Sequence, residues 1–177
     1  MKEKKAFRAG GEGVLNVGDT VVYPMHGAGK IAGIEHCEVL GEDKAYYVLR
    51  LPMGSLKVMI PVDNAESIGL RGVITEDKVK DVLAVLQDKP ERMTGSWNKR
   101  FQANLERMKT GNLCDVAAVA RNLIRQDKQR RISSGEKRLM DLAKQILVSE
   151  LIYACDKSLD EVENWLEELM SSPPKNH

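Results

Sequence analysis

The spacing of hydrophobic and polar positions changes near the middle of the chain. From Val14 to Leu70, residues that favour extended structure alternate with turn formers, and no stretch keeps a period of 3.6 residues. This pattern predicts five short strands, at residues 20–23, 29–39, 44–51, 56–61 and 67–69. Because a small sheet buries its edges by closing on itself, we expect an SH3-like or Tudor-like β-barrel.

Beyond Gly72 the apolar positions recur at helical spacing, and a residue suited to capping precedes each run. These residues are Thr75, Ser96, Asn112, Ser133 and Ser158. Glu136 and Glu161 stand three positions after the last two, which is the spacing of a capping box. We therefore predict an α+β chain in which a C-terminal bundle of about five α-helices follows the N-terminal barrel.

The change of pattern also divides the chain into segments. We expect a flexible leader over residues 1–13, a Tudor-like domain over 14–70, a helical domain over 71–172 and a tail over 173–177. Of the 177 residues, 42% are hydrophobic and 30% charged, which is typical of a globular protein. No apolar run approaches the ~18 residues of a membrane span. The basic N-terminus leads into glycines instead of a signal sequence, so we expect a cytoplasmic protein with no membrane partner.

Residues suited to catalysis are few. Cys37, Cys114 and Cys155 are odd in number and widely spaced, which predicts reduced structural thiols and no zinc site. His36 and Cys37 are neighbours on a predicted strand and therefore point to opposite faces, which disfavours a hydrolase built on this pair. The glycines at 27–30 lack the spacing of a phosphate loop. We expect no enzyme, no metal, no cofactor and no small-molecule substrate.

Charge is unevenly distributed, although the net charge is only +1. Residues 97–144 hold 12 basic and 5 acidic residues, a net charge of +7, whereas residues 145–177 hold 2 basic and 7 acidic residues, a net charge of −5. The polar face of the helix after Asn112 contributes Arg121, Arg125 and Lys128. Such a segment suits a polyanionic partner, and an ordinary solvated face would explain it as well.

The two tryptophans occupy different settings. Trp165 lies among leucines of the acidic last helix, where it predicts a core anchor. Trp97 follows Ser96 at a helix start, and Lys99 and Arg100 in the first turn oppose the helix dipole, where acidic residues would favour stability. The residues alone leave two interpretations open: a wedge against a DNA base step, flanked by phosphate-binding cations, or a buried anchor between helices.

Several motifs resemble the CarD/CdnL family of bacterial transcription regulators, whose barrel is shared with transcription-repair coupling factors. These are VGDTVVYP at 17–24 followed by HG at 26–27, IPVDNAE at 60–66, WNKRFQANLE at 97–106 and SGEKRLM at 134–140. They occur in the family's order and spacing across residues 15–170. We expect the coupling-factor module to lack the helical half, so motifs in both halves make the resemblance specific.

The resemblance implies a monomeric factor with two partners. The barrel would bind the RNA polymerase β subunit, and the helical half would bind promoter DNA without recognising an operator. Trp97 matches the family's wedge, which enters the minor groove at the upstream edge of the melted promoter and stabilises the open complex. Lys99 and Arg100 match cations that contact the DNA backbone, and Lys137 and Arg138 match basic residues of the second motif.

The resemblance also implies a polymerase-binding face on the barrel. Lys57, Val58, Met59 and Ile60 would dock strand to strand, through main-chain hydrogen bonds that tolerate substitution. Cys37 and Met59 stand where some members carry arginines, so the side-chain grip would differ here. The alternative function is a polymerase-binding adaptor whose helical domain recruits an acidic protein instead of DNA.

Overall fold

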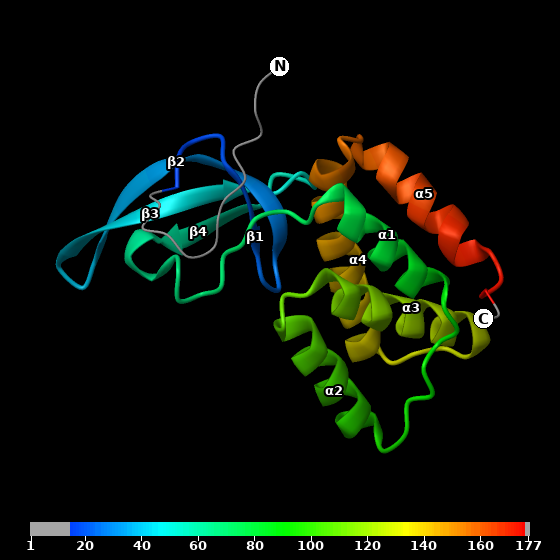
Figure 1. Cartoon of the computed structure of the whole chain (residues 1–177). Helices are drawn as coiled ribbons and strands as arrows, with labels where there is room; N and C mark the ends of the chain where they lie inside the picture. The colour runs from blue at the N-terminus through cyan, green and yellow to red at the C-terminus, as the bar shows by residue number, and fades with distance from the viewer. Residues whose placement is uncertain (1–14, 176–177) are drawn as a thin grey trace.

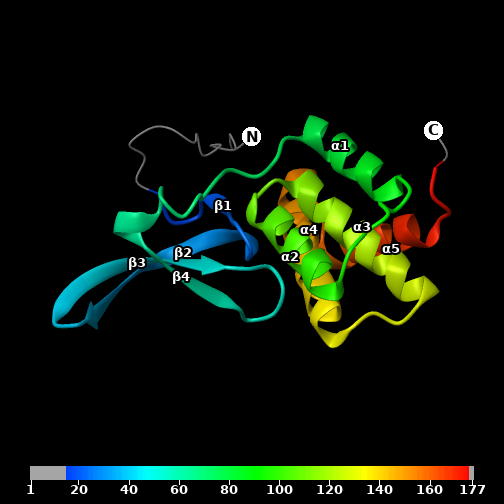
Figure 2. The same cartoon turned by 90° about the horizontal axis from the view of Figure 1, so that it is seen from below.

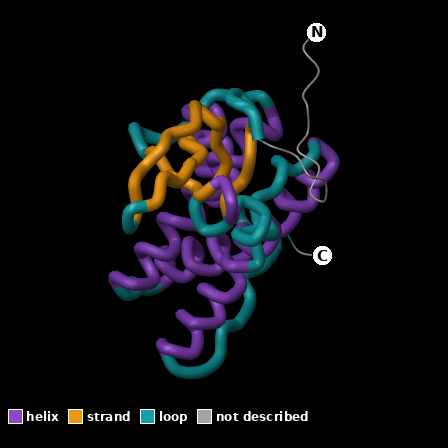
Figure 3. The backbone as a smooth tube through the Cα atoms, turned by 90° about the vertical axis from the view of Figure 1, so that its left-hand side faces the viewer, coloured by secondary structure: helices purple, strands orange, loops and turns teal. Residues whose placement is uncertain are grey.

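The computed structural model describes residues 15–175. In this range a four-stranded sheet precedes five α-helices (Figure 1). The strands are β1 (Thr20–Tyr23), β2 (Gly27–Val39), β3 (Glu42–Arg50) and β4 (Lys57–Pro61), followed by a 3-10 turn, η1 (Val62–Asn64). The helices are α1 (Glu76–Gln87), α2 (Trp97–Lys109), α3 (Leu113–Gln129), α4 (Ser134–Cys155) and α5 (Leu159–Ser171). Figure 1 shows the strands at one end of the molecule and the helices at the other, and Figure 3, seen from the sheet side, shows the strands gathered in one group.

The strands pair in sequence order, and every neighbouring pair is antiparallel. A bulge between Ile31 and Gly33 interrupts the β2–β3 register, and the hairpin beyond it projects away from the helices (Figure 1). At its tip Leu40 is 98% exposed. The barrel has its own small apolar core. This core consists of Leu15, Val21, Ile31, Tyr47, Leu49, Leu51, Ile60 and Leu70.

The prediction of a fifth strand at residues 67–69 is wrong. This segment turns on itself, because Ile68 N–H donates to the Asn64 carbonyl and Gly69 N–H to the Glu66 carbonyl. Local bonds of this kind compete with the extended conformation that a strand needs. The fifth pairing instead falls on Arg71, which forms an isolated antiparallel bridge with Val22. The fold class is confirmed: a Tudor-like barrel domain is followed by a helical bundle.

The predicted caps stand at the helix starts. Ser96 and Asn112 accept N–H bonds from the first turns of α2 and α3, and Ser133 and Ser158 form complete capping boxes. Thr75 differs, since it occupies the N-cap position of α1 but its side chain caps nothing. The helices enclose a second apolar core, against which the half-buried Trp165 packs, as predicted for an anchor.

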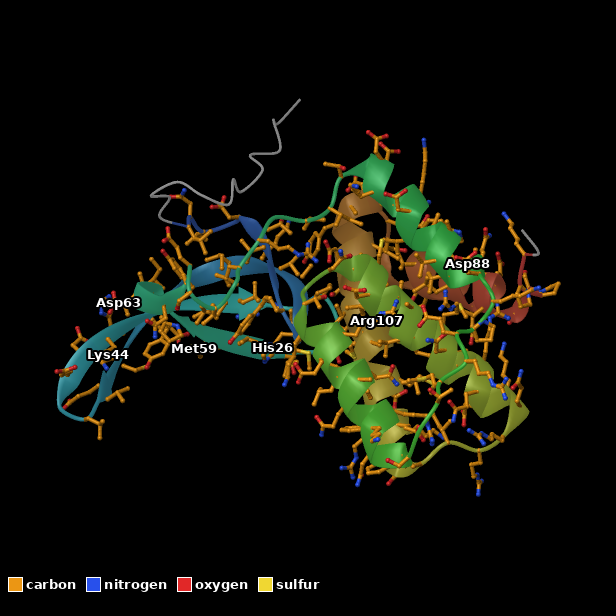
Figure 4. All side chains as sticks on the ribbon, turned by 60° about the horizontal axis from the view of Figure 1, so that its bottom comes forward. His26, Lys44, Met59, Asp63, Asp88 and Arg107 are labelled. Atoms are coloured by element: carbon orange, nitrogen blue, oxygen red, sulfur yellow. The ribbon has the colours of Figure 1, made fainter. Side chains whose placement is uncertain are left out.

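The barrel meets the helical half along α4 (Figures 1 and 4). Met25 and Met53, both from barrel loops, pack against the helical core. Figure 4 places His26 at this boundary and Met59 and Lys44 on the barrel away from it. Within residues 15–175 no helix has the length and apolarity required to span a bilayer.

Candidate nucleic-acid interface

The N-terminal ends of α2 and α4 lie side by side at one end of the helical half (Figure 2). The Trp97 indole N–H donates to the Ser133 hydroxyl over 2.8 Å. Because Trp97 is the first residue of α2 and Ser133 is the N-cap of α4, this bond joins the two helix starts. Each start presents the positive end of a helix dipole, so the junction favours anions.

The Trp97 side chain is held in place while much of it remains exposed. Trp97 is 42% exposed. Its ring stacks on Phe101 with centroids 5.4 Å apart and an interplanar angle of 20°. A methyl group built on Gly135 would lie 3.3 Å from Trp97 Cζ2, so the indole passes directly over the first turn of α4. We call Trp97, Phe101, Ser133 and Gly135 the Trp97 corner. Trp97 is therefore a half-exposed aromatic in a fixed orientation, which agrees with the wedge interpretation better than with a buried anchor between helices.

Four of the predicted DNA-binding cations lie near the starts of the two helices that meet at this corner. Lys99 and Arg100 lie in the first turn of α2, and Lys137 and Arg138 follow Gly135 in α4. Lys99, Lys137 and Arg138 are exposed and form no salt bridge with any described residue. Arg100 is partly engaged, since its Nη1 donates to the Gly95 carbonyl over 2.7 Å.

Three other predicted DNA-binding cations lie elsewhere. Arg121 is only 3% exposed, and its guanidinium donates to Asn122 Oδ1 and the Val85 carbonyl. The prediction for Arg121 is therefore wrong, because its donors are consumed inside the helical core. Arg125 and Lys128 are turned towards the end of α5, where they donate to the Ser172 and Met170 carbonyls. The structure does not bring these three residues to Trp97.

Glu91 anchors the loop before α2 and neutralises part of the basic segment. It accepts bonds from Arg107 at 2.6 and 3.2 Å and pairs with Arg121 at 3.2 Å. The hydrogen bonds from Arg107 lower the pKa of Glu91 below its usual 4.5. This loop and α2 enclose a surface cavity of about 220 Å³, lined in part by Lys99 and Arg100. The charges of Arg107 and Arg121 are thus paired with Glu91, whereas the exposed cations near Trp97 form no such pair.

Sequence reasoning missed part of the Trp97 corner and two neighbouring cations. Ser133 was identified as a cap, but nothing in its local pattern indicates that its hydroxyl also holds an indole from residue 97. Phe101 stands one helical turn after Trp97, and that i, i+4 spacing could have identified the stacked pair. Arg130 and Arg131 are exposed in the α3–α4 loop, immediately before the Ile132–Ser133 step that carries the cap.

The predicted polymerase-binding residues divide between the two faces of the sheet. Lys57 and Met59 alternate with Val58 and Ile60 along β4, and Ile60 is fully buried while Val58 packs on the barrel core. Cys37 faces Lys44 two positions beyond the last β3–β4 pair, nearer the hairpin tip than Met59. In the described sheet β4 is an edge strand, so its outer main-chain groups are available for pairing.

The cysteines and histidines considered for catalysis do not come together in the described part of the chain. Cys37, Cys114 and Cys155 are thiols, and burial raises the pKa of Cys114. His36 Nδ1 lies 3.2 Å from Asp43 and is exposed on the hairpin. Within residues 15–175 no three His, Cys, Asp or Glu side chains group as metal ligands.

Comparisons with known proteins agree with this architecture. Two family models match, the CarD-like/TRCF RID domain over residues 15–74 and the CarD C-terminal domain over residues 81–167. The chain belongs to the CarD/CdnL family, as its motifs predicted. It is a CarD-like transcription regulator, of a class linked to RNA polymerase.

Individual relatives cover different shares of the chain. YdeB, a candidate transcription factor of Bacillus subtilis (strain 168), is 36% identical over 138 residues, which are 78% of this chain and 90% of YdeB. The transcription-repair-coupling factor of Staphylococcus aureus (strain USA300) is 28% identical over 155 residues, 85% of this chain but 12% of that protein. The solved structure "CdnLNt from Myxoccoccus xanthus" is 41% identical, covers 36% of this chain and 89% of its own, and has a TM-score of 0.31.

The coupling-factor alignment corrects one expectation. We expected the coupling-factor module to lack the helical half. An alignment of 155 residues extends well beyond the barrel match at 15–74, so similarity to that protein continues into the helices.

Proposed function

We propose that this protein stabilises the open promoter complex in the cytoplasm through two simultaneous contacts. The barrel binds the RNA polymerase β subunit, and the helical half binds promoter DNA at the upstream edge of the bubble. Trp97 wedges into the minor groove there, and no operator sequence is read. The protein acts as a binding factor without an enzymatic step.

The observation that carries this proposal is the oriented, half-exposed indole of Trp97 between two helix N-termini. A wedge must be rigid, because an aromatic that has to be ordered on binding loses affinity. Stacking on Phe101 and the bond to Ser133 order the ring before DNA arrives. Unstacking a base step costs a few kcal/mol, which additional protein contacts must offset.

Cations around the Trp97 corner are suited to supply those additional contacts. Lys99, Lys137 and Arg138 are exposed and free of ion pairs with described residues, so no internal bond has to break before they meet phosphates. Phosphate contacts give affinity with little sequence preference. We leave Arg121, Arg125 and Lys128 out of this surface, because their donors serve the protein interior or the end of α5.

Edge strand β4 supports the polymerase half of the proposal. Its main chain can extend the sheet into a partner strand, and Lys57 and Met59 would flank that pairing on the face opposite the core. Lys57 Nζ already pairs with Glu35 at 2.8 Å, so its charge is shared with the barrel. Ile60 contributes only backbone groups, because its side chain is buried.

The lifetime of the open complex on a ribosomal-type promoter tests the proposal. We expect Trp97→Ala to shorten it about tenfold, equivalent to about 1.4 kcal/mol of lost stabilisation. Trp165→Phe is the matched control. Trp165 packs on the helical core, so its substitution should leave the lifetime unchanged. An unchanged lifetime with Trp97→Ala, in a folded and polymerase-bound protein, contradicts the wedge. Absence of binding to forked DNA at low salt would favour the adaptor function instead.

A further inference from the structure

Arg71 is bonded to both halves of the molecule. Its backbone pairs with β1, where Val22 N–H donates to the Arg71 carbonyl at 2.7 Å and Arg71 N–H donates to the Val22 carbonyl at 3.1 Å. Its side chain enters the helical half, where Nε and Nη2 donate to the Gly111 carbonyl at 3.0 and 2.8 Å. One residue therefore ties the first strand of the barrel to the turn between α2 and α3.

The partner of Arg71 within the helices is Glu150 of α4. Glu150 is fully buried, and its two oxygens accept bonds from Arg71 Nη1 at 2.6 Å and Nη2 at 2.9 Å. The same carboxylate accepts the Ile74 N–H at 2.9 Å. A two-point guanidinium–carboxylate bond fixes orientation as well as distance. We call Arg71, Glu150, Ile74 and the Gly111 carbonyl the interdomain lock.

A second set of contacts lies beside the lock. Ala28 N–H donates to the Ser149 hydroxyl at 2.9 Å, which brings the start of β2 onto α4. Gly27 has a φ of 112°, and a methyl group there would collide with the Ser149 hydroxyl, so only glycine fits this approach. Met25 and Met53 pack on the helical core from the barrel side. The junction thus combines buried polar bonds with shared apolar packing.

We propose that Arg71 and Glu150 are positioning residues that hold the barrel and the helical half at one fixed angle. The inference rests on the proposed function and extends it, because docking of the barrel on polymerase then determines where Trp97 is presented. Halves joined only by a flexible linker would spread Trp97 over many positions, and its effective concentration at the DNA fork would fall. Small interdomain interfaces commonly allow such motion, which the lock opposes here.

A distance measurement tests the lock independently of transcription. Spin labels at Leu40→Cys, on the exposed hairpin tip, and at Glu167→Cys, exposed on α5, report the separation of the halves in the full chain. The native cysteines are replaced by alanine for this measurement. We expect one narrow distance with an intact lock and a broad distribution in Arg71→Met/Glu150→Gln. That double variant removes both charges, so neither is left buried without its partner.

Open-complex lifetime tests the positioning role, with the native cysteines retained. We expect Arg71→Met/Glu150→Gln to shorten the lifetime about tenfold, because the effective concentration of Trp97 at the DNA fork falls. The affinity of the barrel for polymerase and the affinity of the helical half for DNA, each measured separately, should not change. Lys80→Met/Glu163→Gln is the matched control, since it also removes one cation and one anion, but both are exposed on the helical half and neither belongs to the lock. If the lock variant does not fold, Arg71→Lys keeps the charge without the two-point bond and provides both readouts.

Each outcome decides the inference. Equally narrow distances with and without the lock overturn it, and so does a broad distribution in the parent protein. Broadened distances with a lifetime equal to the control overturn the positioning role. If Trp97→Ala leaves the lifetime unchanged in the same assay, the proposed function fails, while the distance measurement still decides whether the lock holds the halves together.

Discussion

The indole N–H of Trp97 donates to the hydroxyl of Ser133 across 36 positions of sequence, at a donor–acceptor distance of 2.8 Å. The same hydroxyl accepts the Glu136 N–H and contacts the Glu136 carboxylate, so a single serine both caps α4 and orients the indole. The exposed indole at the start of α2 is thereby held in place by a residue at the start of α4.

Replacing Ser133 by alanine separates capping from orientation of the indole. We expect Ser133→Ala to lower the free energy of unfolding by about 1 kcal/mol, because a helix cap is lost. It should also increase the mobility of Trp97, since one of its fixed contacts is removed. Urea denaturation gives the first quantity, and fluorescence anisotropy in a Trp165→Phe background gives the second.

Ser158→Ala is the matched control for this experiment. Ser158 forms the same capping box at the start of α5 without any contact to Trp97. It should cost a similar free energy and leave the Trp97 anisotropy unchanged. Equal anisotropy in Ser133→Ala and Ser158→Ala would show that the hydroxyl does not order the indole.

Salt dependence of DNA binding identifies the cations that meet phosphates. Each of Lys99→Ala and Lys137→Ala should reduce the slope of log affinity against log salt by about 0.9, because one phosphate contact and its counterion release are lost. Lys80→Ala, on the exposed surface of α1, should leave the slope unchanged. Titration of a forked duplex by fluorescence provides the measurement, and a slope that responds equally to all three variants would argue against a localised surface.

Arg121 is expected to behave as a structural residue. Arg121→Ala should lower the free energy of unfolding by about 2 to 3 kcal/mol, because the Asn122 and Val85 oxygens lose a buried donor. Arg125→Ala, one helical turn later, should cost less than about 0.5 kcal/mol, since its bonds to Ser172 are long at 3.5 Å. Denaturation curves of the two variants provide the comparison. A stable Arg121→Ala protein with a reduced salt slope would restore Arg121 to the DNA surface.

Stability at acid pH should depend on Glu91. Hydrogen bonds from Arg107 lower the pKa of Glu91 in the folded state below 4.5, so the ionised carboxylate stabilises the fold above that value. This contribution is lost as pH falls through the depressed folded-state pKa. Glu91→Gln should therefore be less stable than the parent at pH about 7, and the difference should vanish once the pH falls below the depressed folded-state pKa of Glu91.

Urea midpoints measured across that pH range test the Glu91 prediction. Glu163→Gln, an exposed carboxylate on α5 outside the ion pairs of the described chain, controls for a general effect of charge removal. A difference between the parent and Glu91→Gln that persists at low pH would mean that the ionised carboxylate is not the source of the stabilisation.

Local features of the chain were sufficient to place most elements and the aromatic at the helix start. Capping boxes act within four residues, so Ser133 with Glu136 and Ser158 with Glu161 could be identified from spacing alone. Trp97 was singled out for the same reason, because Lys99 and Arg100 in its own helical turn contradict the dipole rule. The turn at residues 67–69 was mistaken for a strand, since short apolar segments do not reveal whether their hydrogen bonds are local or across a sheet.

Only the tertiary structure decided which charges are available and how the two halves meet. Arg121 and Arg125 look alike in sequence, yet one is buried because the loop at Glu91 folds over α3 and the other is not. The bonds from Trp97 to Ser133 and from Arg71 to Glu150 join residues 36 and 79 positions apart. Local propensity and periodicity extend over a few residues, whereas burial and two-point bonds arise only when distant segments pack together.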